Sequence, residues 1–210
     1  MRRKVFLGVL LLFFFLIVAV LGLVWGTLSA SLPTLDGNLE AAGLERPVEV
    51  ERDPLGIPTI RGENRKDIAY ATGFVHAQDR FFQMDTLRRR AAGELSELFG
   101  QATLPADREA RLHRFLVRAD SEFNALHKDE RELLQAYADG ANSGLRQLKA
   151  KPFEYYLLGV EPRRWTPQDC ILVIYAMALD LQENPGHVQL ALDALKRALP
   201  PKAFARSSLM

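Results

Sequence analysis

The hydrophobic pattern changes along the chain from one apolar block to a series of amphipathic segments. Residues 5–25 carry no charge over 21 positions and follow three basic residues at positions 2–4. About 20 apolar residues are enough for a helix to cross a bilayer, whereas the apolar core of a secretory signal spans roughly 7–15. We therefore expect residues 1–27 to form a transmembrane anchor. A long, cleaved signal segment is the alternative, because small residues follow at 29–31.

A linker and a β-hairpin are predicted next. Residues 28–46 contain Ser, Pro, Asp and Gly with weak periodicity, which is typical of a tether. Residues 47–52 then alternate between apolar and charged, as expected for a half-buried strand. The turn at 53–56 contains Pro and Gly, and the return strand is expected at 57–61. This return strand should pair on one side only at its proline, which has no N–H to donate.

The stretch from Gly73 to Gly100 lies largely in the longest amphipathic segment, for which we predict a helix over 67–90 capped by Asp67. Its apolar positions extend over more than one face, which indicates a central helix. Because lone buried charge is expensive, we expect Asp79 and Arg80 to belong to a paired charge network.

The remaining segments predict a mainly α fold. Helices are expected at 94–99, 104–115, 121–126, 128–149, 166–182 and 188–199, with a loop at 162–165. Thr166 followed by Pro167 is a strong start signal for the apolar helix that runs to Gln182. Residues 201–210 form a tail without a pattern.

Composition removes several function classes. Lys and Arg number 27 and Asp and Glu 26, so charge gives no reason to expect a nucleic-acid partner. The single cysteine, Cys170, excludes an intrachain disulfide and a multi-thiolate metal site. Its apolar surroundings favour a buried, inert thiol.

The residues alone reveal no active site. Common nucleophile, metal-ligand and phosphate-loop motifs are missing from the sequence. The four histidines are scattered, and His76 is the best placed of them, although a hydrogen-bonded structural histidine is the simpler interpretation. The run at 88–90 is either a phosphate patch or, as we expect, a solvated face with one arginine paired internally.

Five ordered motifs carry a family resemblance. They are RDxxGIPxI at 52–60, GFxxAQDRFxQMD at 73–85, GxxSExxG at 93–100, QxYAxGxN at 135–142 and RWxPxD at 164–169. In this order they resemble the start of the penicillin acylase family, also called penicillin amidases. The resemblance covers about residues 47–199, which is nearly all of the chain after the linker.

The resemblance implies an N-terminal-nucleophile hydrolase with an αββα fold. In such enzymes a precursor cuts itself into a helical α chain and a large β chain. The first residue of the β chain is a serine, and its free α-amino group acts as the base for its own hydroxyl. The family hydrolyses linear amide bonds in penicillin-like or N-acyl substrates, a chemistry of antibiotic-related metabolism. We expect residues 47–200 to be the α-chain equivalent of this fold, with a short β-hairpin.

The catalytic serine is expected to lie outside this chain. Ser207, Ser208 and Thr27 are poor candidates because of their positions, so no catalytic residue is assigned here. We expect a truncated α-chain-like portion, inactive alone, whose partner is a β-chain equivalent encoded downstream. The alternative is a stand-alone, membrane-anchored helical binding protein that retains the scaffold.

The resemblance suggests two kinds of site residue, of which this sequence contains one. Its α-chain helix end contributes to the acyl pocket, which here corresponds to Ala178, Leu181 and Gln182. A glutamate on the following helix often binds calcium, but residues 186–189 contain none, so no metal ligand or cofactor is assigned. The basic N-terminus predicts that residues 5–25 hold the body on the periplasmic or extracellular side, or that it is secreted after signal cleavage.

Overall fold

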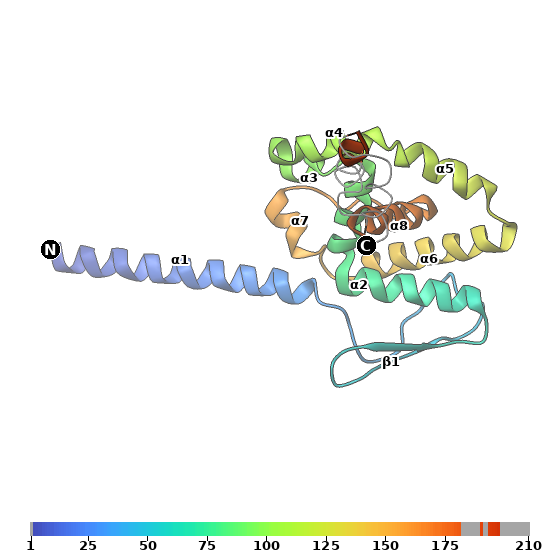
Figure 1. Ribbon diagram of the computed structural model, residues 1–210. Coiled ribbons are helices and arrows are strands. Elements are labelled where there is room, and N and C mark those ends of the chain that lie inside the picture. Colours follow the sequence, from blue (N-terminus) through green and yellow to red (C-terminus); the bar gives the residue numbers. More distant parts are fainter. Residues whose placement is uncertain (1, 182–189, 191–192, 198–210) are drawn as a thin grey trace.

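A computed structural model describes residues 2–181, 190 and 193–197 of the chain. Helix α1, Arg2–Ala30, projects away from a helical body, as Figure 1 shows. Within it, the 23 residues of Gly8–Ala30 are long and apolar enough to cross a membrane, and the body covers none of them. The predicted helix of membrane-spanning length is therefore confirmed, whereas its use as an anchor stays a prediction.

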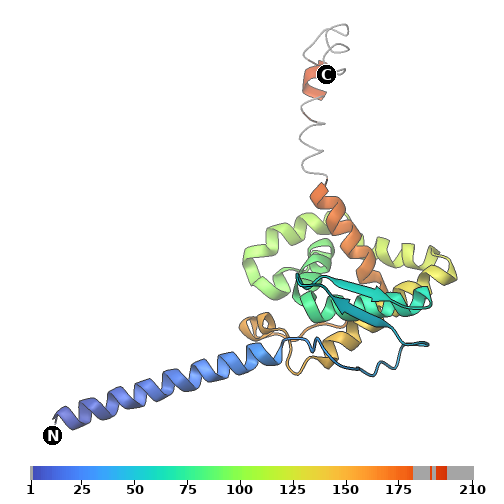
Figure 2. The ribbon, with the colours of Figure 1, turned by 90° about the horizontal axis from the view of Figure 1, so that it is seen from below.

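The body is mainly helical, with one two-stranded hairpin. The elements after α1 are β1 (Glu49–Arg52), β2 (Pro58–Arg61), α2 (Arg65–Ala92), α3 (Ser96–Phe99), the 3-10 helix η1 (Gly100–Thr103), α4 (Leu104–Leu112), α5 (Phe115–Ala125), α6 (Lys128–Gln147), α7 (Phe153–Leu158) and α8 (Pro167–Leu181). Helix α2 lies between the hairpin and a layer formed by α6 and α8 (Figures 1 and 2). The prediction of a mainly α fold with a short hairpin is confirmed.

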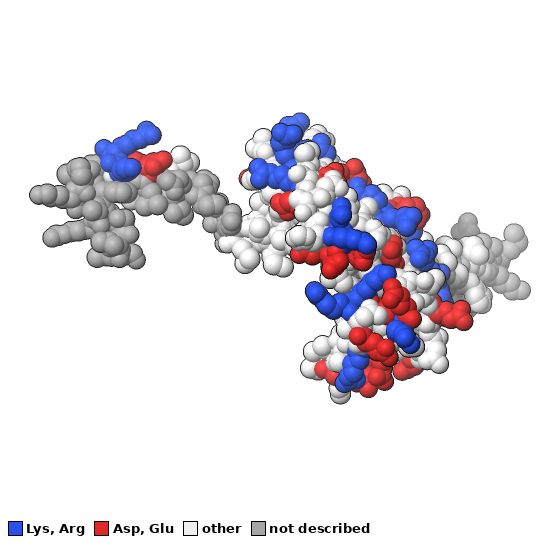
Figure 3. Space-filling model, turned by 90° about the vertical axis from the view of Figure 1, so that its right-hand side faces the viewer, with Lys and Arg blue, Asp and Glu red and all other residues white. Residues whose placement is uncertain are grey.

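Two apolar clusters hold α2 in the centre. One brings Phe81 of α2 against Tyr155 and Trp165, with ring centroids 6.4 and 6.3 Å apart. The other joins the end of α2 to α5 and α8. On the outside, positive and negative side chains are intermixed over the face of the body that Figure 3 shows.

Helices α2 and α6 approach so closely that glycine is required at their contact. A Cβ on Gly73 would collide with the Tyr137 carbonyl oxygen, and one on Gly140 would collide with the Tyr70 carbonyl oxygen. Gly144 faces the Phe74 carbonyl oxygen in the same way. The glycines of the 73–85 and 135–142 motifs therefore set the separation of these two helices.

One local prediction for α2 is wrong, and a second is confirmed only in part. The helix is capped by Asn64, whose side chain accepts from the Asp67 N–H, and not by Asp67 itself. The expected charge pairing is confirmed for Asp79, which accepts two hydrogen bonds of 2.8 and 3.0 Å from Arg52 of β1. This pair lies toward the surface and not in a buried network, and Arg80 is exposed. Arg80 has φ −156° and ψ 40°, so α2 is kinked at the point where a regular helix was expected.

Other predicted boundaries differ by a few residues, and one helix was not predicted. Helix α5 begins at Phe115, six residues before the expected start. Helix α7 was missed because Pro152 was interpreted only as the end of the preceding helix, although it also begins this short one. The hairpin pairs Val50 with Ile60 and Arg52 with Pro58, so each described strand pairs on one side only, as expected. Half of the helix predicted at 188–199 lies outside the described residues, and its described part, 190 and 193–197, is helical as expected.

The buried Asp67 fastens the linker to the body. Its carboxylate accepts hydrogen bonds from the backbone N–H groups of Glu45 (2.9 Å) and Arg46 (3.0 Å) and from the Asn64 amide (2.6 Å). Burial acts to raise the pKa of Asp67, but these hydrogen bonds outweigh it and hold the pKa below its ordinary value. The linker before β1 is therefore strapped across the start of α2.

We expect this strap to loosen in acid. Because the folded-state pKa of Asp67 lies below the unfolded value of about 4, its contribution is present above that value and is lost as the pH falls through the folded pKa. At neutral pH, Asp67→Asn should likewise raise hydrogen exchange at the Glu45 and Arg46 amides. Asp36→Asn, in the exposed part of the same linker, is the control and should leave their exchange unchanged. Equal protection in both variants would contradict the role of Asp67.

Candidate functional site

A buried charge network fixes the start of α8 on α2. Arg88 is fully buried, and its guanidinium binds Asp85 of α2 at 2.7 Å and Asp169 of α8 at 2.6 Å. The same group donates to two backbone carbonyls of the preceding loop, at positions 163 and 164. It also lies 4.8 Å from the centre of the Trp165 ring. Charge pairing, hydrogen bonding and stacking together satisfy a guanidinium that could not be buried alone.

The network corrects the prediction for residues 88–90. Two of these arginines are buried, not one, because Arg89 also binds Asp85 at 3.0 Å. Arg90 alone is substantially exposed, with its side chain 45% accessible, and it pairs with Asp180 near the end of α8. The run is thus neither a phosphate patch nor a solvated face, and it ties both ends of α8 to α2.

A second set of hydrogen bonds fixes the loop before α8. Asn142 of α6 donates its amide to the Trp165 carbonyl and accepts from the Trp165 N–H, both at 2.8 Å. Asp169 accepts from the N–H and the hydroxyl of Thr166 at 2.7 and 2.9 Å. The predicted helix start at Thr166 is confirmed. Helix α8 therefore leaves the body in a direction set by α2, α6 and this loop.

Helix α8 carries an uncovered apolar stripe. Ile174, Met177 and Leu181 recur at three- and four-residue spacing and are 64%, 58% and 79% exposed. Ala178, beside them, is half-buried. Of the predicted acyl-pocket residues, the structure thus places Ala178 and Leu181 on or beside one stripe, and Gln182 lies outside the described residues. We name Ile174, Met177, Ala178 and Leu181 the α8 stripe.

An apolar groove lies between α2, α6 and the first half of α8. Its cavity of about 460 Å³ is lined by residues that include His76, Tyr137, Cys170 and Val173. The His76 ring nitrogen and the Tyr137 hydroxyl are 2.9 Å apart, so this histidine is hydrogen-bonded, as expected. Partial removal from water and the nearby charge of Arg80 lower the pKa of His76. The lowered pKa favours the neutral form of the His76 imidazole, which is compatible with its position in an apolar groove.

Cys170 shows no sign of a reactive thiol. Burial raises the pKa of the Cys170 thiol to about 11, so it stays protonated at neutral pH. Its sulfur lies 3.4 Å from the indole nitrogen of Trp165, which donates to it. This environment fits the predicted inert thiol.

Potential metal ligands are scattered over the part of the chain that the structure describes. No cluster of three His, Cys, Asp or Glu side chains suitable for a metal ion occurs among these residues. The segment at 186–189, whose lack of a glutamate was the reason for assigning no calcium ligand, lies outside them.

Comparison with known proteins decides the family. A family model described as penicillin amidase matches residues 47–208. The chain belongs to the penicillin amidase family. This finding confirms the resemblance inferred from the five motifs. The matched segment begins at residue 47, where the first predicted strand begins, and contains all five motifs.

Individual relatives agree with the family assignment. The chain is 41% identical over 152 residues to penicillin acylase 2 proenzyme from Pseudomonas sp. (strain SE83), covering 72% of this chain and 20% of that protein. It is 32% identical over 166 residues to acyl-homoserine lactone acylase QuiP from Pseudomonas aeruginosa, covering 77% of this chain and 20% of that protein. The chain therefore spans about one fifth of the length of these curated relatives.

A solved structure supports the fold. A thermostable penicillin G acylase from Alcaligenes faecalis aligns with a TM-score of 0.63 at 27% identity, covering 78% of this chain and 91% of that chain. The fold therefore matches the N-terminal part of a penicillin acylase, as predicted from the sequence.

Proposed function

We propose that this chain is the α-chain-like part of an acylase-type amidohydrolase, which hydrolyses a linear amide bond in penicillin-like or N-acyl substrates. The observation that carries the proposal is the family match from residue 47 to 208, which includes the α8 stripe. The exposed stripe supports it further, because an apolar helix face left in water is typical of a binding surface.

In this proposal the chain forms part of the substrate pocket, and a second chain provides the catalytic residues. The resemblance implies a β chain that begins with serine, whose α-amino group has an ordinary pKa of about 8 and can take the proton of the hydroxyl. Ala178, Leu181 and Gln182 would form one wall of the acyl pocket. The network around Arg88 would act at a distance, by holding the direction of α8 and with it the position of that wall.

The proposal includes a location. Three basic residues at positions 2–4 begin α1, so by the positive-inside rule we expect the N-terminus in the cytoplasm and the body on the periplasmic or extracellular side. Residues 1–27 then serve as the anchor and 28–46 as the strapped linker. Cleavage after α1 would give a secreted form with the same body.

A chimaeric precursor tests the proposed function. Residues 47–208 of this chain replace the matching segment of penicillin acylase 2 proenzyme from the SE83 strain, and the product is assayed with a chromogenic acyl-anilide. We expect self-cleavage into two chains and turnover, whereas this chain alone gives none. A chimaera that folds but neither cuts itself nor hydrolyses the anilide would contradict the proposal and favour the binding-protein alternative. Turnover by the chain alone would contradict both the proposal and that alternative.

The proposed acyl wall predicts a change of selectivity in the same chimaera. Ala178→Leu adds bulk within the α8 stripe and should lower kcat/KM for the longest acyl chains by roughly tenfold or more, with little effect on short ones. Ala125→Leu, the same substitution at an exposed position of α5, is the matched control and should change neither. An equal loss for all acyl lengths would indicate a folding defect and contradict a role in selectivity.

A further inference from the structure

The short helix α7 presents an apolar face to the outside. Phe153, Tyr156 and Leu157 are 42%, 49% and 79% exposed, and their spacing of three and four residues places them on one side of the helix. Three large apolar side chains on six residues are a dense patch for a surface helix.

The opposite side of α7 fixes its orientation. Tyr155 is fully buried, and its hydroxyl donates to Asp85 at 2.8 Å, so it joins the network around Arg88. Its ring also meets Phe82 edge-on, with centroids 5.4 Å apart. Lys151, at the base of the helix, donates to the Val160 carbonyl at 2.9 Å. Because α7 is pinned at both sides, its outer face cannot turn inward to bury itself.

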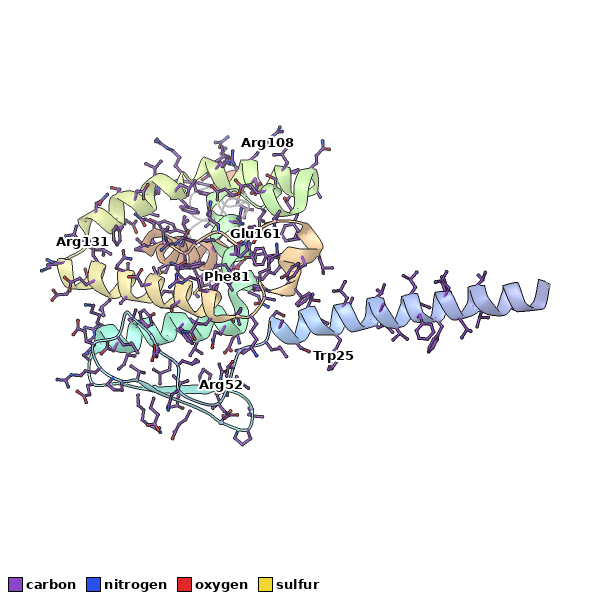
Figure 4. All side chains as sticks on the ribbon, turned by 180° about the vertical axis from the view of Figure 1, so that it is seen from behind. Trp25, Arg52, Phe81, Arg108, Arg131 and Glu161 are labelled. Carbon is purple, nitrogen blue, oxygen red and sulfur yellow. The ribbon has the colours of Figure 1, made fainter. Side chains whose placement is uncertain are left out.

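The end of α1 lies directly beside the start of α7. The N–H of Ala150 donates to the carbonyl of Ala30, the last residue of α1, at 3.0 Å. Figures 1 and 4 show α7 on the side of the body from which α1 projects, and Figure 4 shows Trp25 close to that exit. Trp25 is 74% exposed and five residues from the end of α1, where an interfacial aromatic residue is expected.

We propose that the outer face of α7 inserts into the interface of the bilayer that α1 crosses. The inference rests on the proposed anchoring role of α1. If α1 spans the membrane with Trp25 at its surface, the contact between Ala30 and Ala150 brings α7 to the same depth. Aromatic and aliphatic side chains are favoured at that depth, and Phe153, Tyr156 and Leu157 are of these types.

The surrounding charge favours an apolar contact over headgroup recognition. The neighbours of the face are mixed, with Lys149 and Lys151 near Glu154 and Glu161. Lys151 is itself paired with Glu161 at 2.6 Å. The contact should therefore not depend on anionic lipid. It would limit the tilt of the body and so fix which side of it faces away from the membrane.

A depth-sensitive label tests the contact in the full chain. Leu157→Cys in a Cys170→Ser background carries an environment-sensitive fluorophore, and the chain is inserted into phosphatidylcholine nanodiscs with and without nitroxide lipid. Leu112→Cys, 80% exposed at the end of α4, is the matched control. We expect blue-shifted emission at 157 that is mostly lost with nitroxide lipid, and neither effect at 112.

Each other outcome overturns the proposal for a different reason. Emission at 157 that matches position 112 would show that α7 stays in water although the chain is anchored. Blue-shifted emission without nitroxide quenching would show that protein, not lipid, covers the face. A chain that does not enter nanodiscs at all would refute the anchor itself, while leaving the proposed acylase function untouched.

Discussion

Replacing Arg88 by Met is expected to destabilise the folded chain strongly. The substitution leaves the buried carboxylates of Asp85 and Asp169 without their shared cation. Removing one partner of a buried pair typically costs about 3–5 kcal/mol, and whole domains have only about 5–15 kcal/mol to lose. The loss should appear as a lower midpoint in urea unfolding of the detergent-solubilised chain, followed by Trp165 fluorescence.

Two further variants distinguish the loss of buried charge pairing from a general effect of replacing an arginine in this run. Arg90→Met removes a half-exposed arginine paired with Asp180 and should cost at most about 1 kcal/mol. Adding Asp169→Asn to Arg88→Met removes one orphaned charge and should restore part of the stability. Equal losses of stability from the Arg88 and Arg90 substitutions would show that the buried charge network is not a main source of the stability of the fold.

Replacing Gly140 by Ala is expected to destabilise the protein, against the trend of helix propensity. In an open helix this change stabilises by roughly 0.5–1 kcal/mol. Here the added Cβ would strike the Tyr70 carbonyl oxygen, which is backbone and cannot swing aside. Forcing α2 and α6 apart should cost about 1–3 kcal/mol, measured by the same urea unfolding.

The neighbouring Asp139 provides the control for this prediction. Its side chain is exposed and accepts a hydrogen bond from Gln135 of the same helix at 3.1 Å. Asp139→Ala should therefore change the free energy of unfolding by no more than about 0.5 kcal/mol. A stabilising Gly140→Ala would mean that the two helices are farther apart than the structure places them.

Much of the fold could be predicted from the sequence, because hydrophobic periodicity and the turn and cap residues that end each element are local signals. The hairpin, the long α2 and the start of α8 at Thr166 followed directly from alternation, helical spacing and a cap. The pairing of charges did not, because it depends on positions far apart in the chain. Asp79 pairs with Arg52, and Arg88 pairs with Asp169, across separations of 27 and 81 residues.

The candidate site was only partly predictable for a related reason. Ala178 and Leu181 came from the family resemblance, whereas Ile174 and Met177 of the same stripe were missed. Helix α8 is apolar on nearly all sides, so its spacing alone did not show which face the body covers. That face is defined only by the packing of Leu172 and Ala176 toward α2 and α5.

The α8 stripe is, in our proposal, a surface for the catalytic chain of an acylase. The most direct test is the rate of thiol modification at Met177→Cys, in a Cys170→Ser background, measured in this chain alone and in the chimaeric precursor. We expect rapid modification in the isolated chain, where Met177 is 58% exposed, and strong protection in the chimaera. Equally rapid modification in both would contradict it.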